Sequence, residues 1–367
     1  MPLSASPSLP ALPFLTRAQA PLTCEVEAVN EYGELHRISI PAERALTVYV
    51  DKRELVTLMT LGAHPELLVL GYLRNQRLVK AATDIESITV DWDVAAAAVK
   101  TRHGIENIEE KTARRVVTTG CGQGSVFGGL MDEVDQIELP PGACITQSQL
   151  YGLVNTIRLK ETTYKSAGSV HACALFDTTG AEPDMLLFVE DVGRHNAIDT
   201  IAGWMAMQNM APTLVAARTA LPPEGAELAR GGPSLRSMAP TIPTACASGD
   251  SLPLERGERG ELGSRAGLTS PAALPPSGTG GLVFYTTGRL TSEMVIKSAQ
   301  MGVPIVVSRS GITQMGYQVA QSVGLCAIGR ATNKRFVCYT QAQRLKLQPG
   351  LVTRPDVKLD TATDHTA

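Results

Sequence analysis

The stretch TTGCGQGSVFGG, Thr118–Gly129, places one cysteine, Cys121, among five glycines. Glycine-rich turns leave a side chain accessible and let a ligand approach the backbone. The spacing is not that of a nucleotide-binding loop, because G-x-G-x-x-G needs glycine where Ser125 or Phe127 stands, and no G-K-[ST] follows. Cys121 is therefore either a reactive thiol or an incidental loop cysteine. Nearby cations favour the thiolate, and three basic residues lie upstream, namely Lys111, Arg114 and Arg115.

A second set of candidates follows three apolar runs, LVFYT, PIVVS and LCAIG, near the C-terminus. Unbroken apolar runs of this length are typical of buried parallel strands. Ligands of open α/β sheets bind beyond the carboxyl ends of such strands, and helix N-termini in these loops favour anions. The pattern predicts a site for a phosphate-bearing ligand, with solvated loop arginines as the alternative. The arginines concerned are Arg289, Arg309, Arg330 and Arg335.

The segment EDVGRHNAID is the third candidate, because Glu190, Asp191, Arg194 and His195 lie between a strand end and a helix start. Such a density of titratable groups suits general acid–base chemistry or anion binding. A local ion-pair cluster at a helix capped by Asn196 is the equally good alternative.

Alternating strands and helices must position these residues, and they predict an α/β fold. The runs SVHACALFD and MLLFVEDVG predict strands, and HNAIDTIAGWMAMQNM predicts a helix. Residues 281–330 then read as strand, helix, strand, helix, strand, and RFVCYT adds a last strand. In the N-terminal third, residues 24–51 and 87–100 predict strands, and residues 53–79 predict a helical region.

Changes in composition divide the chain. Residues 211–280 hold ten prolines, ten glycines and no aromatic residue, and such a segment buries too little apolar surface to offset its ordering entropy. We therefore expect a disordered insertion there. The expected order is a disordered tail at 1–22, a smaller β-rich α+β domain at 23–146 that ends in the Cys121 loop, an α/β domain at 147–343 and a loose tail at 344–367.

Charge and cysteine usage exclude several classes of protein. The net charge of −3 gives no global attraction to nucleic acid or an anionic membrane. The seven cysteines include no C-x-x-C, so neither a disulfide framework nor a thiolate zinc site is indicated. The N-terminus lacks a basic region before an apolar one, and no apolar run is long enough to span a bilayer. These features predict a cytoplasmic protein.

Five segments in this order resemble the FdhD/NarQ family of formate dehydrogenase accessory sulfurtransferases, over roughly residues 24 to 343 apart from the insertion. They are TTGCGQGS, GSVHACALFD, VEDVGRHNAIDTIAG, TTGRLTSEMVIKSAQMGVPIVVSRSG and FVCYT. The resemblance implies a cytidine deaminase-like three-layer α/β fold for the second domain. The deaminase zinc signature, H-x-E with P-C-x-x-C, is absent, so the fold would be present without deaminase chemistry.

The resemblance also implies a function. Family members carry sulfur from a cysteine desulfurase to a molybdenum cofactor with two molybdopterin guanine dinucleotides, for use by formate dehydrogenase. Cys121 would become the persulfide, and the protein would be a homodimer. The residues that would contact the cofactor are Ile328, Gly329, Arg330, Ala331, Thr332, Asn333, Arg289, Arg309, Arg194 and His195.

The sequence departs from the family pattern in two places. Family members often have a second cysteine three residues after the first, where this chain has Gly124, and their connection at 211–280 is much shorter. Without a thiol at position 124, the sulfur would leave as a persulfide nucleophile or through another thiol. Two other functions stay open: a cofactor-binding chaperone that moves no sulfur, and a nucleotide hydrolase that uses Asp191 and His195.

Overall fold

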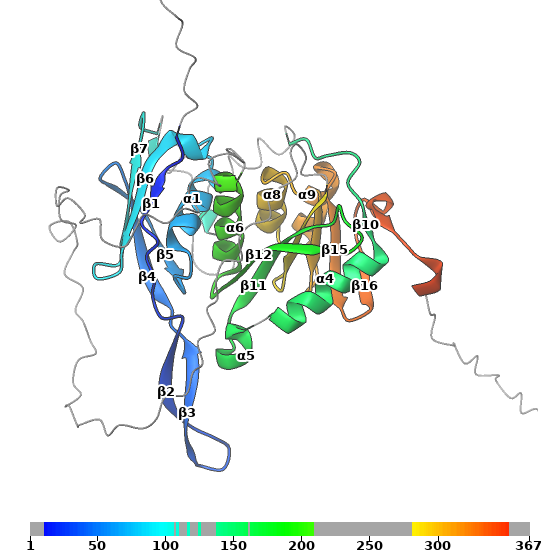
Figure 1. Ribbon diagram of the computed structural model, residues 1–367, viewed down its shortest axis with the longest axis horizontal. Helices are drawn as coiled ribbons and strands as arrows, with labels where there is room; N and C mark the ends of the chain where they lie inside the picture. Colours follow the sequence, from blue (N-terminus) through cyan, green and yellow to red (C-terminus); the bar gives the residue numbers. More distant parts are fainter. Residues whose placement is uncertain are drawn as a thin grey trace, which may run out of the picture.

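The computed structural model describes residues 11–105, 108–109, 116–117, 124–125, 137–160, 162–208 and 281–351. Cys121 and the insertion expected at 211–280 lie outside these residues. A β-rich N-terminal unit and a layered α/β unit stand side by side, with helices α1 and α6 between them (Figure 1). No helix among the described residues is long and apolar enough to cross a membrane.

The N-terminal unit is a five-stranded sheet with strand order β1-β6-β7-β4-β5. Buried and partly exposed side chains alternate along β4 and define the buried face of the sheet. Leu46, Val48 and Val50 point into a core that helix α1 covers. A separate two-stranded hairpin projects from this unit (Figure 1). The elements are β1 (Phe14–Leu15), β2 (Thr23–Val29), β3 (Leu35–Pro41), β4 (Arg44–Val50), β5 (Arg53–Thr60), α1 (Pro65–Asn75), η1 (Ala82–Asp84), β6 (Ile85–Asp91) and β7 (Ala96–Thr101).

Two expectations for this unit are wrong. The helical region predicted from residue 53 is a strand as far as Thr60, since burial there follows a two-residue alternation at Leu58 and Thr60. The helix begins only at Pro65, which occupies its first turn. The expected N-terminal tail also contributes structure, because Phe14–Leu15 pairs with β6 and the Thr16 hydroxyl donates to Glu66 at 2.6 Å.

The second unit confirms the predicted α/β class. Its six-stranded sheet has the order β12-β11-β13-β14-β15-β16, and β13, β14 and β15 are parallel as predicted. Helices α6, α8 and α9 cover one face and α4 the other, which makes three layers (Figure 1). The elements are α4 (Gln147–Lys160), α5 (Thr163–Ala167), β11 (His171–Asp177), β12 (Asp184–Asp191), α6 (Arg194–Gln208), β13 (Leu282–Thr286), α8 (Ser292–Gln300), β14 (Ile305–Ser308), α9 (Gln314–Ser322), β15 (Cys326–Thr332) and β16 (Arg335–Cys338).

The C-terminal tail expected from residue 344 begins later than predicted. Strand β17 (Leu345–Lys346) pairs with β10 (Ile145–Thr146), just before α4. Arg344 is buried and its guanidinium donates to the carbonyl of Pro140 at 2.7 Å. The described chain then ends in the short helix η6 (Pro349–Leu351). Gln348, just before it, is hydrogen-bonded to Gln147 and Ser148, so the segment after β16 holds the start of α4. The remaining short elements are β8 (Val116–Val117), β9 (Gly124–Ser125) and η5 (Ala342–Arg344).

The two units meet where α1 crosses α6, and glycines make the crossing close. A Cβ atom on Gly71 would overlap the carbonyl oxygen of Asp199, and one on Gly203 would overlap that of Leu67. Helix α6 begins at Arg194, so Asn196 lies inside its first turn and is not the predicted cap. The Asn196 amide instead donates to the Met59 carbonyl of β5 at 2.6 Å, which joins α6 to the N-terminal sheet.

Replacement of Gly71 by alanine should therefore separate the two helices. We expect Gly71→Ala to lower the free energy of unfolding by about 1–3 kcal/mol, the usual cost of overpacking, although alanine has the better helix propensity. Gly142→Ala is the control, because no atom lies within 4 Å of its added Cβ. Urea denaturation of both variants measures the effect, and equal stabilities would contradict the close crossing.

Candidate functional site

The loops after β13, β14 and β15 meet at one edge of the sheet, as predicted from parallel strands. The Arg309 amide donates to the Thr286 carbonyl at 3.0 Å, and the Ser308 hydroxyl donates to the Gly288 carbonyl at 2.7 Å. The Arg330 amide in turn donates to the Ser310 carbonyl at 2.7 Å. These bonds fix the positions of three loops that carry arginines.

A pocket of about 460 Å³ opens at this edge, and we call it the carboxyl-edge pocket. Strand β11 runs antiparallel to β13, so its first residue, His171, lies at the same edge. The volume falls within the range of small-molecule sites. The lining residues are Tyr164, Val170, His171, Ala172, Thr287, Arg309, Ser310 and Thr332.

Positive charge surrounds the His171 side of the carboxyl-edge pocket. Burial lowers the pKa of His171, and the charges of Arg194 and Arg289 lower it further. Arg194 is held there by packing, because a Cβ on Gly288 would lie 2.8 Å from its Cδ. The glycine of the TTGR segment therefore makes room for the Arg194 side chain, and the neutral imidazole lies among cations, as expected of an anion site before its ligand binds.

Two carboxylates of the EDVGRHNAID segment have structural partners. Glu190 accepts hydrogen bonds from the Thr163 amide at 2.8 Å and the Tyr164 amide at 3.1 Å, which positions α5 and its pocket residue Tyr164. Asp191 is buried and accepts hydrogen bonds from the Thr60 hydroxyl, the Asn196 amide and two backbone amides, so it joins β5 to α6. Its pKa is raised by burial, and these hydrogen bonds act against that shift.

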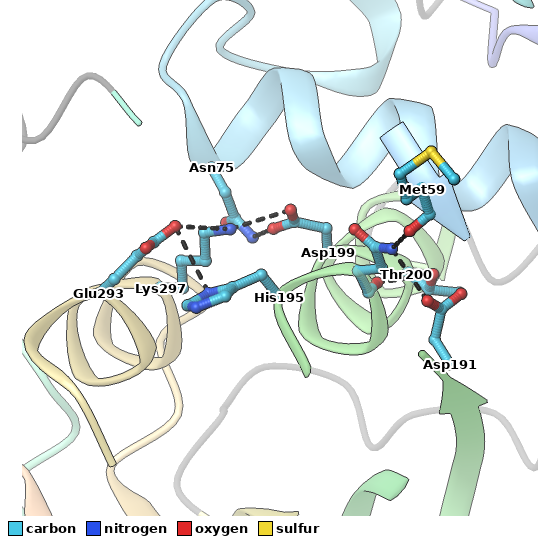
Figure 2. Close-up of polar contacts among 9 residues, drawn as sticks. Met59, Asn75, Asp191, His195, Asp199, Thr200, Glu293 and Lys297 are labelled. Atoms are coloured by element: carbon cyan, nitrogen blue, oxygen red, sulfur yellow. Dashed lines mark hydrogen bonds and ion pairs between the residues drawn. The ribbon is translucent and has the colours of Figure 1, made fainter. Parts of the chain in front are cut away.

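His195 belongs to a buried ion network and not to the lining of the carboxyl-edge pocket (Figure 2). Its Nδ1 lies 3.5 Å from the Glu293 carboxylate, and Lys297 bridges Glu293 at 3.3 Å and Asp199 at 2.9 Å. The Asn75 amide of α1 donates to Asp199 at 2.7 Å and completes the network. The ring therefore points between α6 and α8, which does not favour the predicted contact of His195 with a cofactor.

The predicted run Ile328–Asn333 divides into core and surface. The side chains of Ile328 and Ala331 are buried in the core under α4, and Gly329 packs against Tyr339, so these three have no side chain at the pocket. Arg330, near the end of β15, and Asn333, in the turn that follows, are exposed and adopt left-handed backbone angles, φ 52° and 51°. Only Thr332 of the run lines the carboxyl-edge pocket.

Sequence reasoning did not single out several pocket residues. His171 stands in the GSVHACALFD segment but is not among the predicted site residues, and its place at the edge follows from the antiparallel pairing of β11. Tyr164, Thr287 and Ser310 gave no signal of their own. Of the predicted arginines, Arg309 lines the pocket, Arg289 and Arg330 lie exposed beside it, and Arg335 begins β16.

Cys121 lies outside the described residues, so its surroundings stay a prediction. Among the cysteines that the structure describes, Cys173 is fully buried, and burial raises its pKa to about 12. Cys326 is also buried and its Sγ lies 3.9 Å from that of Cys338. Among all the residues that the structure describes, no group of three or more histidine, cysteine, aspartate or glutamate side chains is placed to hold a metal ion.

Comparison with known proteins identifies the family. The model of the FdhD/NarQ family matches residues 41–219 and 275–346, which is more than half of the chain. The chain belongs to the FdhD/NarQ family. The residues between the two matched segments, 220–274, fall within the predicted insertion.

Relatives in this FdhD/NarQ family match along most of their length. The sulfur carrier protein FdhD of Bacillus subtilis (strain 168) is 26% identical over 325 residues, which cover 86% of this chain and 94% of the relative. That of Wolinella succinogenes is 21% identical over 306 residues, 83% of this chain and 82% of the relative. A solved structure from Desulfotalea psychrophila, named as a formate dehydrogenase accessory protein, is similar in fold, with a TM-score of 0.56, 17% identity and coverage of 89% of this chain and all of that one.

The buried His195 predicts a pH dependence of stability. Burial lowers its pKa to about 3, while the nearby Glu293 acts in the opposite direction. Below pH 6.5 the unfolded chain binds a proton there that the folded chain does not, so stability falls as the pH drops toward 3. Between pH 7 and pH 5 this contributes about 2 kcal/mol.

His195→Gln should therefore reduce the loss of unfolding free energy between pH 7 and pH 5 by that amount, as measured by urea denaturation at both values. The control is His36→Gln, which removes an exposed imidazole from the β2–β3 hairpin and should keep the wild-type dependence. An unchanged difference in His195→Gln would show that His195 takes up its proton in the folded protein.

Proposed function

We propose that this chain is a sulfur carrier that takes persulfide sulfur from a cysteine desulfurase onto Cys121. It then transfers the sulfur to the bis-molybdopterin guanine dinucleotide molybdenum cofactor, for formate dehydrogenase. The names of the matched relatives support sulfur carriage. The single structural observation that supports the proposal is the carboxyl-edge pocket, because Arg309 in its lining and the cations near His171, Arg194 and Arg289, favour an anionic ligand there.

The first step of the proposed reaction is a thiol–persulfide exchange. The Cys121 thiolate attacks the outer sulfur of the desulfurase persulfide, the S–S bond of the donor breaks, and the donor cysteine leaves as a thiolate. Cys121 then carries the persulfide. Because position 124 is glycine, release does not proceed through a disulfide at that position. We propose that the outer sulfur binds the cofactor as a nucleophile, or that another thiol releases it. In both cases that other thiol attacks the inner Cys121 sulfur, the S–S bond breaks, a disulfide forms between the two thiols, and the outer sulfur leaves at the oxidation level of sulfide.

The proposed cargo fits the chemistry of the carboxyl-edge pocket. Guanine dinucleotides carry pyrophosphate groups, and arginine suits such groups because its planar fork of donors matches phosphate oxygens. Arg309 and the exposed Arg289 are the proposed phosphate ligands, and the Thr287 and Ser310 hydroxyls are further donors from the same loops. A pocket of about 460 Å³ holds one part of the cofactor and leaves its remainder outside.

Several finer points belong to the same proposal. The sheet order of the second unit supports a cytidine deaminase-like fold: an antiparallel β12–β11 pair stands beside the parallel strands β13, β14 and β15. We further propose a cytoplasmic homodimer that meets two partners in turn, a cysteine desulfurase as donor and formate dehydrogenase as the acceptor of the cofactor.

The alternative is a chaperone that binds the molybdenum cofactor without moving sulfur. It shares the carboxyl-edge pocket, so the fate of Cys121 separates the two functions. The nucleotide hydrolase that uses Asp191 and His195 is disfavoured by geometry. The Asp191 carboxylate is occupied by its hydrogen bonds to β5 and α6, and the His195 ring lies in the buried network (Figure 2).

Intact mass spectrometry after incubation with a cysteine desulfurase and free cysteine tests the proposed function. We expect wild-type protein to gain the mass of one sulfur atom, which reductant removes. Cys121→Ala should gain none, because the carrier thiol is missing, while the control Cys24→Ala, which removes an exposed thiol, should behave as wild type. A Cys121→Ala variant that still binds cofactor and activates formate dehydrogenase would establish the chaperone function instead.

A further inference from the structure

We propose that His171 is an anion-binding residue of the carboxyl-edge pocket, and that it takes up one proton when a pyrophosphate-bearing ligand binds. The ligand class rests on the proposed function, while the role of His171 rests on its place in the pocket. The imidazole would act as a switchable donor: neutral in the free protein and cationic against the bound phosphate.

Among the residues that line the carboxyl-edge pocket, His171 is the one whose side chain can change charge near neutral pH. It is half-buried at the start of β11 and lines the pocket together with Arg309. Across the β11–β12 pair its register partner is Asp191. The Asp191 carboxylate is directed to Thr60 and Asn196, so it does not neutralise the pocket.

Cations dominate the other elements packed near His171. Arg194 at the start of α6 and Arg289 after β13 both disfavour the protonated ring. The neighbouring His195 interacts with His171 as well, and it is neutral in its buried network. Tyr164 of α5 is the other lining residue with an ionisable ring. A neutral imidazole is therefore the favoured form before a ligand arrives.

A pyrophosphate group reverses that balance. Its negative charges offset those of Arg194 and Arg289 and favour the cationic imidazole, which gains a second N–H donor. One proton moves from solvent to the ring nitrogen that lacked one, and no bond of the ligand changes. Because binding takes up a proton, affinity should rise as the pH falls, by up to about tenfold per pH unit between the pKa values of the bound and free forms.

Titration calorimetry with GDP-mannose tests the proposal. Both phosphates of this guanine nucleotide are esterified, so the probe itself does not titrate near neutrality, unlike GDP. Binding at pH 7 in two buffers of different ionisation enthalpy gives the number of protons taken up. We expect up to one proton in the wild type, and tighter binding at pH 6 than at pH 7.5.

The variants distinguish His171 from the rest of the site. His171→Gln should bind GDP-mannose with no proton uptake and with little change of affinity over this pH range. The control His36→Gln changes a residue of β3, in the hairpin that projects from the N-terminal unit (Figure 1), and should keep both the proton uptake and the pH dependence. Wild-type binding without proton uptake, or uptake that persists in His171→Gln, overturns the role of His171 and leaves the proposed function standing. If wild-type protein does not bind GDP-mannose at all, both this inference and the proposed cofactor site fail, while sulfur loading of Cys121 remains a separate result.

Discussion

The buried ammonium group of Lys297 is the constraint on which the arrangement of the two units depends. Its side chain is 2% exposed, and both of its acidic partners, Asp199 of α6 and Glu293 of α8, are also buried. Removing one partner from such a network leaves an uncompensated buried charge, which costs about 3–5 kcal/mol. Because Asn75 of α1 donates to Asp199 (Figure 2), the same network reaches into the N-terminal unit. One buried network therefore links helices α1, α6 and α8.

This junction also positions the carboxyl-edge pocket. The first turn of α6 holds Arg194 under Gly288, and the preceding Asp191 is joined to Thr60 and Leu61 at the end of β5. The charge near His171 thus depends on contacts between units that are distant in sequence. The close glycine crossing of α1 and α6 sets how near these units lie. The carboxyl-edge pocket is therefore positioned by the buried start of α6 and by the hydrogen-bonded loops after β13 and β14.

Local sequence patterns were sufficient for much of the fold. Unbroken apolar runs predicted the parallel strands β13, β14 and β15, and with them the meeting of the loops that carry Arg289, Arg309 and Arg330. The residues of strand β5 were predicted to be helical because their apolar side chains also fit a helical spacing. The structure shows that the strand and helix α1 are separate elements, with Gly62 in the segment between them. His171 was missed because a residue at the start of a strand reaches this edge only if the strand is antiparallel. Single-sequence periodicity does not specify strand direction. Thr60, which donates to Asp191, and Glu293, the partner of His195, are likewise more than 90 residues away from them in the sequence.

The most direct test of the carboxyl-edge pocket as the nucleotide site is a crystal structure of the full chain grown with GDP-mannose. We predict that the pyrophosphate lies within hydrogen-bond distance of Arg309 and of at least one loop hydroxyl, with His171 facing the phosphate. Nucleotide bound at another surface, with the pocket between α5 and the ends of β13 and β14 unoccupied, would contradict the assignment.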